Sequence, residues 1–335
     1  ISKETIMKSK SSLLASAVLA LSCVAGAASA QTYAIKVANY FAEDHPQNVA
    51  LREKFKALVE KNSNGTMKVQ IFENNKLGGE QQFYTSVRNG TIEMGLPGMI
   101  MQADVPKMGV SEWPFLLRDY QHAQAVLSGP IGKEMAAELE KTHGVHVLAW
   151  TVNGFRMFST SKPVMGMQDF KGLRMRMPNT PIFVKIGQAL GANVSPMPLS
   201  EVFTAMEQKV VDGQDNPIGV VRSSGFYEVQ THILESRHSF SPNVLIVSKK
   251  FWDKLNPGQK KVVEDAATAY ADYEWQLSEA SYEADKKFLM EKKMKFVTPD
   301  ANFRSQMEAA SAPIYDEYFA KYPWGKDLVA KIKGL

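Results

Sequence analysis

The sequence is short of cysteine, of net charge and of long apolar runs. Its 335 residues include one cysteine, Cys23, which cannot pair within its own chain, so a disulfide scaffold is excluded. The 39 lysines and arginines against 35 aspartates and glutamates give a formal net charge of +4. That charge is small for this length and gives no electrostatic support to a nucleic-acid partner. The hydrophobic fraction of 44% and charged fraction of 22% exclude disorder of the whole chain.

Common catalytic signatures are also missing. The sequence has no G-x-x-x-x-G-K-S/T loop, no G-x-G-x-x-G after a strand, no H-E-x-x-H and no G-x-S-x-G. Of the six histidines, only His143 and His146 are close together. A capping or surface role suits them better than a metal site, for which no third ligand is designated. We therefore expect no metal, no cofactor and no enzymatic activity.

One apolar stretch lies near the start of the chain. Residues 13–28 carry no charge, follow a short basic segment and run into an A-x-A cleavage pattern at residues 28–30. This pattern predicts a secretory leader over residues 1–30 and a mature protein outside the cytoplasmic membrane. A membrane anchor is disfavoured because the run is shorter than the ~20 residues that a span needs. A lipoprotein attached at Cys23 is an alternative, but the A-x-A site is better formed.

From residue 33 onward, segments typical of strands and of helices alternate. Apolar patterns predict strands at residues 33–39, 67–72, 92–96, 145–150, 173–177, 210–212 and 244–247. Helical stripes predict helices at residues 46–61, 80–88, 119–128, 131–142, 181–190, 199–208, 301–321 and 324–333. Two rounds of this rhythm indicate an α/β fold with a largely parallel sheet. The helical pattern over 257–293 is unusually long and is expected to bridge two domains.

Two arginines stand in positions suited to binding an anion. Arg176 lies near the end of the predicted strand at 173–177, and Arg156 follows an Asn-Gly pair. A guanidinium in such a place can hold a carboxylate through two parallel hydrogen bonds. Asn216, in the polar loop at 213–217, adds a further donor. A structural ion pair is the other interpretation of Arg176, and the residues alone favour it.

Six short motifs resemble those of the substrate-binding subunits of tripartite ATP-independent periplasmic (TRAP) transporters. They are LGGE at 77–80, WPFLLRD at 113–119, NGFR at 153–156, DFKGLRMRMP at 169–178, SEVF at 200–203 and VDGQDNP at 211–217. Each motif is short, but their combined order and spacing behind a leader is specific. The resemblance covers residues 33–335.

The resemblance implies a periplasmic-binding-protein-like fold. Two α/β lobes would surround a ligand cleft, joined by crossing strands and by a long helix that spans both lobes. By analogy, residues 31–153 plus 242–281 form lobe one, and residues 154–241 plus 282–335 form lobe two. Residues 1–30 are the leader, and the mature protein is expected in the periplasm as a monomer.

The resemblance also implies ligand contacts. In the family, an arginine on the strand before the proline grips the substrate carboxylate, and Arg176 occupies that position. Arg156 matches a second arginine that often lines the cleft, and Asn216 matches the cleft asparagine. The remaining implied residues are Asn179 and Glu80 as polar contacts, and Phe115 and Trp150 as walls of the cleft. A place in the core suits the two aromatic residues at least as well.

The implied function is capture of a small organic acid by closure of the cleft and its delivery to a TRAP permease. Phe155 stands where sialic-acid binders of the family carry threonine, and it counts against sialate. Glu80 favours a ligand with hydroxyl groups, such as a sugar acid, over a plain dicarboxylate. The implied substrate is therefore a sugar acid or a hydroxy or dicarboxylic acid. The alternatives are a sensor that presents the ligand to a signalling receptor and, less favoured, an enzyme on the same scaffold.

Overall fold

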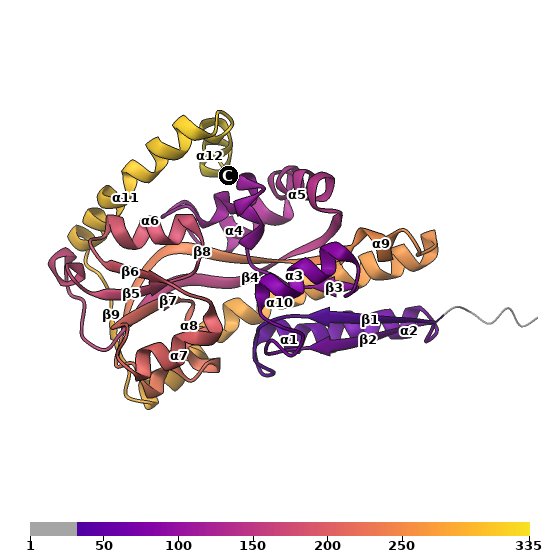
Figure 1. Cartoon of the computed structure of the whole chain (residues 1–335), viewed down its shortest axis with the longest axis horizontal. Coiled ribbons are helices and arrows are strands. Elements are labelled where there is room, and N and C mark those ends of the chain that lie inside the picture. Colours follow the sequence, from indigo (N-terminus) through magenta and orange to yellow (C-terminus); the bar gives the residue numbers. More distant parts are fainter. Residues whose placement is uncertain (1–31) are drawn as a thin grey trace, which may run out of the picture.

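The chain folds into two α/β halves that share one continuous sheet (Figure 1). The computed structural model describes residues 32–335, so the predicted leader at 1–30 lies outside the described residues. Within the described part, helices cover the sheet on both sides, and the predicted α/β class is confirmed.

The first half of the chain supplies three strands that pair in parallel: β1 (Tyr33–Ala38), β2 (Met67–Phe72) and β3 (Met94–Gly95). The alternation in β1 buries Ile35 and Val37 completely, as its sequence pattern predicts. Its helical elements are α1 (Pro46–Ala50), the π-helical η1 (Leu51–Lys56), α2 (Ala57–Asn62), α3 (Glu80–Asn89), the 3-10 helices η2 (Ile100–Ala103) and η3 (Pro106–Glu112), α4 (Tyr120–Ser128) and α5 (Pro130–His143).

Two long antiparallel strands cross between the halves: β4 (Val145–Thr160) and β8 (His232–Ser248). The second half adds the strands β5 (Arg174–Met177), β6 (Asn193–Pro196), β7 (Gly213–Asn216) and β9 (Lys295–Val297). Its helical elements are η4 (Met167–Phe170), α6 (Pro181–Ala189), α7 (Leu199–Glu207), α8 (Ile218–Ser223) and η5 (Phe226–Glu228). Beyond β8, α9 (Lys249–Trp252) packs in the core of the first half.

The nine-stranded sheet has the order β2-β1-β3-β8-β4-β7-β5-β6, and β9 pairs with β8. β3 of the first half pairs with the C-terminal end of β8, and β7 of the second half pairs with the C-terminal end of β4. The crossing strands therefore belong to both halves. The expectation of a largely parallel sheet was wrong in the middle of the molecule. There β3, β8, β4 and β7 pair antiparallel, because the two crossing strands run in opposite directions between the halves.

The crossing strands are longer than the predicted segments at 145–150 and 244–247. The chain bends at their centre without leaving the sheet, through register shifts on either side of Gly154. Gly154 has φ +121, and a Cβ on it would stand 2.8 Å from the hydroxyl of Tyr120. Gly154 and Pro242, which signal turns in sequence, therefore mark bends inside the strands.

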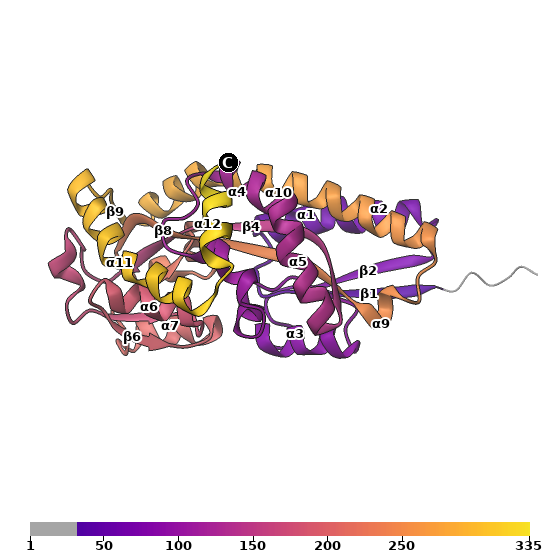
Figure 2. The same cartoon turned by 90° about the horizontal axis from the view of Figure 1, so that it is seen from above.

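The helix predicted at 257–293 is confirmed as α10 (Pro257–Glu291), which runs along both halves (Figure 2). The Asn256 side chain caps its first turn by accepting from the Gln259 N–H, and the Gln259 side chain accepts in return from the Asn256 N–H. α10 packs against β4 and also against α1 and α8, so it contacts both halves.

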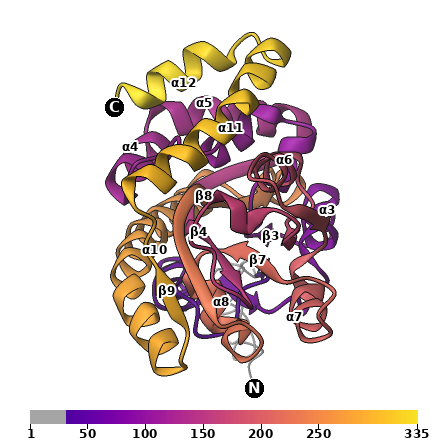
Figure 3. The ribbon, with the colours of Figure 1, turned by 90° about the vertical axis from the view of Figure 1, so that its left-hand side faces the viewer.

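The C-terminal helices run from the second half back toward the first (Figure 1), and the end-on view draws α11 and α12 on the same side of the sheet as α4 and α5 (Figure 3). α11 (Ala301–Lys321) packs against α6, and α12 (Gly325–Lys333) follows it. The Tyr315 hydroxyl donates to the Pro114 carbonyl at 2.7 Å, and a ring nitrogen of His122 lies 2.8 Å from the Ile332 carbonyl. The segment at 282–335, predicted as part of lobe two, thus ends on elements assigned to lobe one.

Within residues 32–335 no helix is long and apolar enough to cross a membrane. The same residues contain no group of three or more histidine, cysteine, aspartate or glutamate side chains placed to hold a metal ion.

Candidate ligand site

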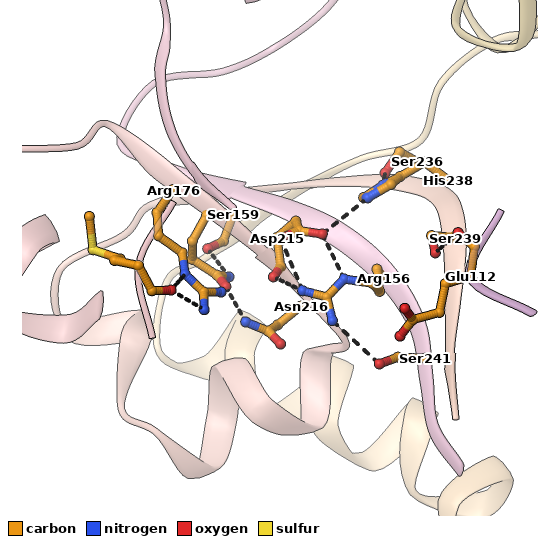
Figure 4. A network of polar contacts seen from close by, with 12 residues as sticks. Glu112, Arg156, Ser159, Arg176, Asp215, Asn216, Ser236, His238, Ser239 and Ser241 are labelled. Atoms are coloured by element: carbon orange, nitrogen blue, oxygen red, sulfur yellow. Dashed lines mark hydrogen bonds and ion pairs between the residues drawn. The ribbon is translucent and has the colours of Figure 1, made fainter. Parts of the chain in front are cut away.

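Three neighbouring strands of the second half bring the predicted polar residues together. β4, β7 and β5 lie side by side and carry Arg156, Asn216 and Arg176 (Figure 4). Each of these side chains is more than nine-tenths buried. The strands come from distant parts of the sequence, so only the sheet topology places these side chains in one cluster.

Arg156 is held by a buried ion pair. Its Nε lies 2.6 Å from Oδ2 of Asp215 and its Nη2 lies 3.0 Å from Oδ1, a fork-to-fork arrangement. The guanidinium also stacks 4.4 Å from the centre of the Phe183 ring on α6. Its remaining nitrogen, Nη1, donates to the Ser241 hydroxyl at 3.4 Å. Most of the hydrogen-bonding capacity of Arg156 is therefore used within the protein.

Asp215 is supported from its other side by His238. Nε2 of His238 lies 3.3 Å from Oδ2 of Asp215, and the Ser236 hydroxyl lies 2.8 Å from Nδ1. Burial alone would raise the pKa of the Asp215 carboxyl, but Arg156 and His238 reverse this and hold it well below the usual range. Burial lowers the pKa of His238, so its ring is neutral at pH 7 and donates from Nε2 to the carboxylate.

Arg176 differs from Arg156 because part of its guanidinium has no partner. Its Nε and Nη2 both donate to the Met197 carbonyl, at 3.0 and 2.8 Å. Nη1 is buried and makes no hydrogen bond within residues 32–335. Burial lowers the pKa of the group to about 10, an effect that Asp215 offsets only in part. A buried cation with a free donor costs stability unless an anion pairs with it.

Asn216 extends the cluster along β7. Its Nδ2 donates to Oε1 of Gln214 at 2.6 Å, and the Gln214 amide donates in turn to the Ser159 hydroxyl at 2.8 Å. This chain fixes the orientation of the amide and leaves the carbonyl oxygen of the Asn216 side chain for another donor.

The first half of the chain contributes carboxyl groups on the opposite side. Glu80, at the start of α3, accepts from the Gly98 N–H at 2.6 Å. Burial raises the pKa of its carboxyl to about 7, although the charges of Arg176 and Arg156 work against this shift. Glu80 therefore lies within electrostatic reach of both arginines.

Sequence reasoning missed three further polar groups beside Glu80. Glu112, at the end of η3, is 3% exposed and accepts from the Gln102 amide at 2.6 Å. Burial raises its pKa to about 8, and Arg156 opposes that rise. The Asn243 amide donates to the Tyr40 hydroxyl at 2.8 Å, and its oxygen is buried without a hydrogen bond in the described chain. The only sequence signal for Glu112 was its place directly before the WPFLLRD motif.

The other predicted contacts lie differently. Trp150 belongs to the hydrophobic core, with its indole N–H directed to the Gly132 carbonyl at 3.3 Å. Phe115 is half-buried under the guanidinium of Arg304, which lies 4.7 Å from its ring centre. Asn179 is exposed between β5 and α6. The core interpretation therefore describes Trp150 best.

A separate cavity of about 360 Å³ lies beside α10. Phe155 and Met157 line it, whereas Arg156 does not. Because neighbouring residues of a strand point to opposite faces, this cavity lies on the other face of β4 from Arg156. It is distinct from the arginine cluster.

Two lobes that share crossing strands and enclose buried arginines define a protein that binds a small anion. The chain is similar throughout to proteins of this class. The model of the family described as "Bacterial extracellular solute-binding protein, family 7" matches residues 37–322. This chain belongs to that family, and the resemblance to TRAP substrate-binding subunits is confirmed.

Several relatives carry ligands in their descriptions. A TRAP periplasmic solute-binding protein from Haemophilus influenzae, solved with bound L-gulonate, is 41% identical with a TM-score of 0.88 and covers 90% of this chain and 99% of that chain. The sugar acid binding protein DctPAm from Advenella mimigardefordensis, in complex with galactonate, is 32% identical with a TM-score of 0.86. The match covers 91% of this chain and 97% of that chain. The 2,3-diketo-L-gulonate-binding periplasmic protein YiaO of Escherichia coli K12 is 32% identical over 85% of this chain and 87% of its own. The family thus binds small organic acids in the periplasm and works with TRAP permease subunits.

Proposed function

We propose that this protein captures a sugar acid in the periplasm and delivers it to a TRAP permease. The observation that carries the proposal is the buried, unpartnered Nη1 of Arg176. A ligand carboxylate would accept from it and would neutralise a charge that the fold compensates only in part. The sugar acids in the descriptions of the similar structures support this choice of ligand.

Binding requires the lobes to separate and close. Arg176 is 3% exposed and Arg156 4% exposed, so neither can be reached while the halves are together. The crossing strands bend at Gly154, and this bend, together with α10, which spans both halves, provides a hinge between the lobes. A ligand that touches Arg176 on one lobe and Glu80 on the other favours the closed form by its own binding energy.

Each residue of the cluster has a distinct part in this proposal. Arg176 binds the carboxylate, and Arg156, held rigid by Asp215, presents a fixed positive charge beside it. Asn216 and Glu80 contact hydroxyl groups, and Asn179 contributes from the rim. The proposed lobes are residues 31–153 plus 242–281 and residues 154–241 plus 282–335, and the C-terminal helices of the second lobe also contact the first.

The protein acts as a monomeric carrier that makes and breaks no bond. Ser236, His238 and Asp215 are ordered like a hydrolase triad, but all three are fully buried. His238 contacts the Asp215 carboxylate that pairs with Arg156, so this set serves to position Arg156. The leader at 1–30 would direct the chain to the periplasm.

Isothermal titration calorimetry with L-gulonate and galactonate tests the role of Arg176. A charge-assisted hydrogen bond contributes about 1.5–3 kcal/mol, so Arg176→Ala should weaken binding roughly 10- to 150-fold. Arg174→Ala is the matched control, because Arg174 lies on the same strand but is exposed and paired with Asp212. If Arg176→Ala binds as tightly as Arg174→Ala, the proposed carboxylate site is wrong.

A further inference from the structure

The cavity of about 360 Å³ beside α10 has walls from both halves of the molecule. His45 and Tyr120 line it from the first half, Ile218 and Arg237 line it from the second, and residues 278–285 of α10 form a further wall. A volume of this size lies in the range that small organic ligands occupy. Because the cavity lies on the other face of β4 from Arg156, a ligand in it would not compete for the arginine cluster.

The lining residues carry more negative than positive charge. The acidic ones are Asp119, Glu279, Glu283 and Asp285. The one basic residue among them is Arg237, whose guanidinium lies 4.1 Å from the centre of the Phe155 ring. His45 adds no charge, because burial lowers its pKa to about 3. A cavity lined in this way favours a cationic ligand.

Asp285 brings a buried carboxylate to the cavity wall. It is 5% exposed, and its Oδ1 accepts from the Arg222 guanidinium at 2.7 Å. Its Oδ2 would lie 3.3 Å from a Cβ built on Gly219, which also lines the cavity. Burial raises the pKa of Asp285, Arg222 opposes this rise, and the charge of Asp44 in the first half adds to it. Asp44 and Asp285 therefore repel each other across the two halves, and a cation beside Asp285 would offset that repulsion.

Asn153 adds a polar side chain that the fold leaves unpaired. It lines the cavity, is 8% exposed, and its Oδ1 is buried without a hydrogen bond within residues 32–335. The rings of Tyr120 and Tyr282 are also part of the lining, and the faces of such rings attract organic cations. Carboxylate, amide and aromatic groups together suit an organic ammonium with an apolar body.

We propose that this cavity is a second ligand site, which binds a small organic ammonium and is coupled to sugar-acid binding in the cleft. The ammonium pairs with the Asp285 carboxylate and contacts the Asn153 amide, and the exposed Glu279 and Glu283 add attraction. Opening the cleft on one face of the crossing strands brings together the elements on the opposite face. A ligand that fills the cavity therefore opposes opening and strengthens sugar-acid binding.

The coupling is reciprocal, so a sugar acid strengthens ammonium binding by the same factor. The coupling rests on the proposed function, whereas the site itself does not.

The probe is 2-phenylethylamine, which is an ammonium at neutral pH, and 2-phenylethanol is its uncharged counterpart. Isothermal titration calorimetry measures the binding of each to the protein alone and to the protein saturated with L-gulonate. We expect the amine to bind at least about tenfold more tightly than the alcohol, because only the amine can pair with Asp285. Saturation with L-gulonate should strengthen amine binding by at least about threefold.

Two variants locate the site. Asp285→Asn removes the buried charge and should weaken amine binding by at least about tenfold. The side chain of its partner Arg222 is 37% exposed, so water can solvate the guanidinium that is left. The double variant Glu279→Gln, Glu283→Gln changes only exposed positions and should weaken amine binding roughly threefold, since screened charges contribute less.

Glu264→Gln is the matched control. Glu264 is exposed on the same helix but does not line the cavity. Its replacement should leave the affinity for the amine and the effect of L-gulonate at the wild-type values.

The inference is overturned if the amine does not bind, if 2-phenylethanol binds as tightly, or if L-gulonate displaces the amine. It also fails if Asp285→Asn and the double variant both bind the amine as tightly as Glu264→Gln does. Equal amine affinity with and without L-gulonate refutes the coupling. None of these results changes the role of Arg176. If the amine binds as expected and L-gulonate does not bind, the site stands, while the proposed function and the coupling fail.

Discussion

Breaking the Arg156–Asp215 pair tests how the anion site is kept rigid. Asp215→Asn removes the negative charge with little change in size and leaves the Arg156 guanidinium buried without a counter-charge. The side chains are 4% and 0% exposed, so solvent cannot replace the lost partner. Removing one partner of a buried ion pair costs about 3–5 kcal/mol. We expect the free energy of unfolding to fall by about 3 kcal/mol, since the asparagine oxygen still accepts one hydrogen bond.

Urea unfolding followed by circular dichroism measures this loss. Asp212→Asn is the control, because Arg174 and Asp212 form a similar fork in the same sheet but are 47% and 22% exposed. An exposed pair is screened by water and contributes little, so the control should stay close to the wild type. If Asp215→Asn loses no more stability than Asp212→Asn, the buried pair does not hold the site.

Three other changes test the hinge, a buried carboxyl and the C-terminal helix. Gly154→Ala should weaken ligand binding and destabilise the fold by about 2 kcal/mol or more, because φ is +121 and the new Cβ meets the Tyr120 hydroxyl. Calorimetry measures the affinity and urea unfolding measures the stability. Adding Tyr120→Phe, which removes that hydroxyl, should recover part of the loss. Burial raises the pKa of Glu274 to about 8, above its unfolded value, so its contribution to stability is lost as pH rises toward 8. Glu274→Gln should therefore flatten the fall in stability between pH 5 and 8, and equal slopes would contradict this. Deleting residues 325–335 uncovers core packed by Leu328, Val329 and Ile332, and should lower stability by about 3 kcal/mol or more, measured by thermal unfolding.

The overall fold was predictable where local patterns agree with the final structure. The long helical pattern that begins at Pro257 predicted α10 to within two residues of its C-terminal end. The alternating apolar residues of β1 likewise predicted a half-buried strand. The crossing strands were underestimated because Gly154 and Pro242 are turn signals in sequence but lie at bulges within paired strands here. Only tertiary pairing reveals that difference.

Part of the candidate site could likewise be predicted from sequence motifs, and part of it depends on the fold. Arg176 was singled out from its motif, but the free Nη1 that supports its proposed role depends on how the Met197 carbonyl accepts from the other two nitrogens. Asp215 and Glu112 could not be distinguished from other acidic residues, since burial and the nearness of Arg156 are properties of the fold. Trp150, an aromatic residue just before the NGFR motif, packs in the hydrophobic core.

Calorimetric titration of L-gulonate against its uncharged alditol, which lacks the carboxylate, tests the central claim most directly. The two ligands carry the same hydroxyl groups apart from the acid end. The proposed pairing of a carboxylate with Arg176 predicts that gulonate binds and that the alditol binds at least about tenfold more weakly. Equal affinity for the two would contradict the assignment of Arg176 as the carboxylate-binding residue.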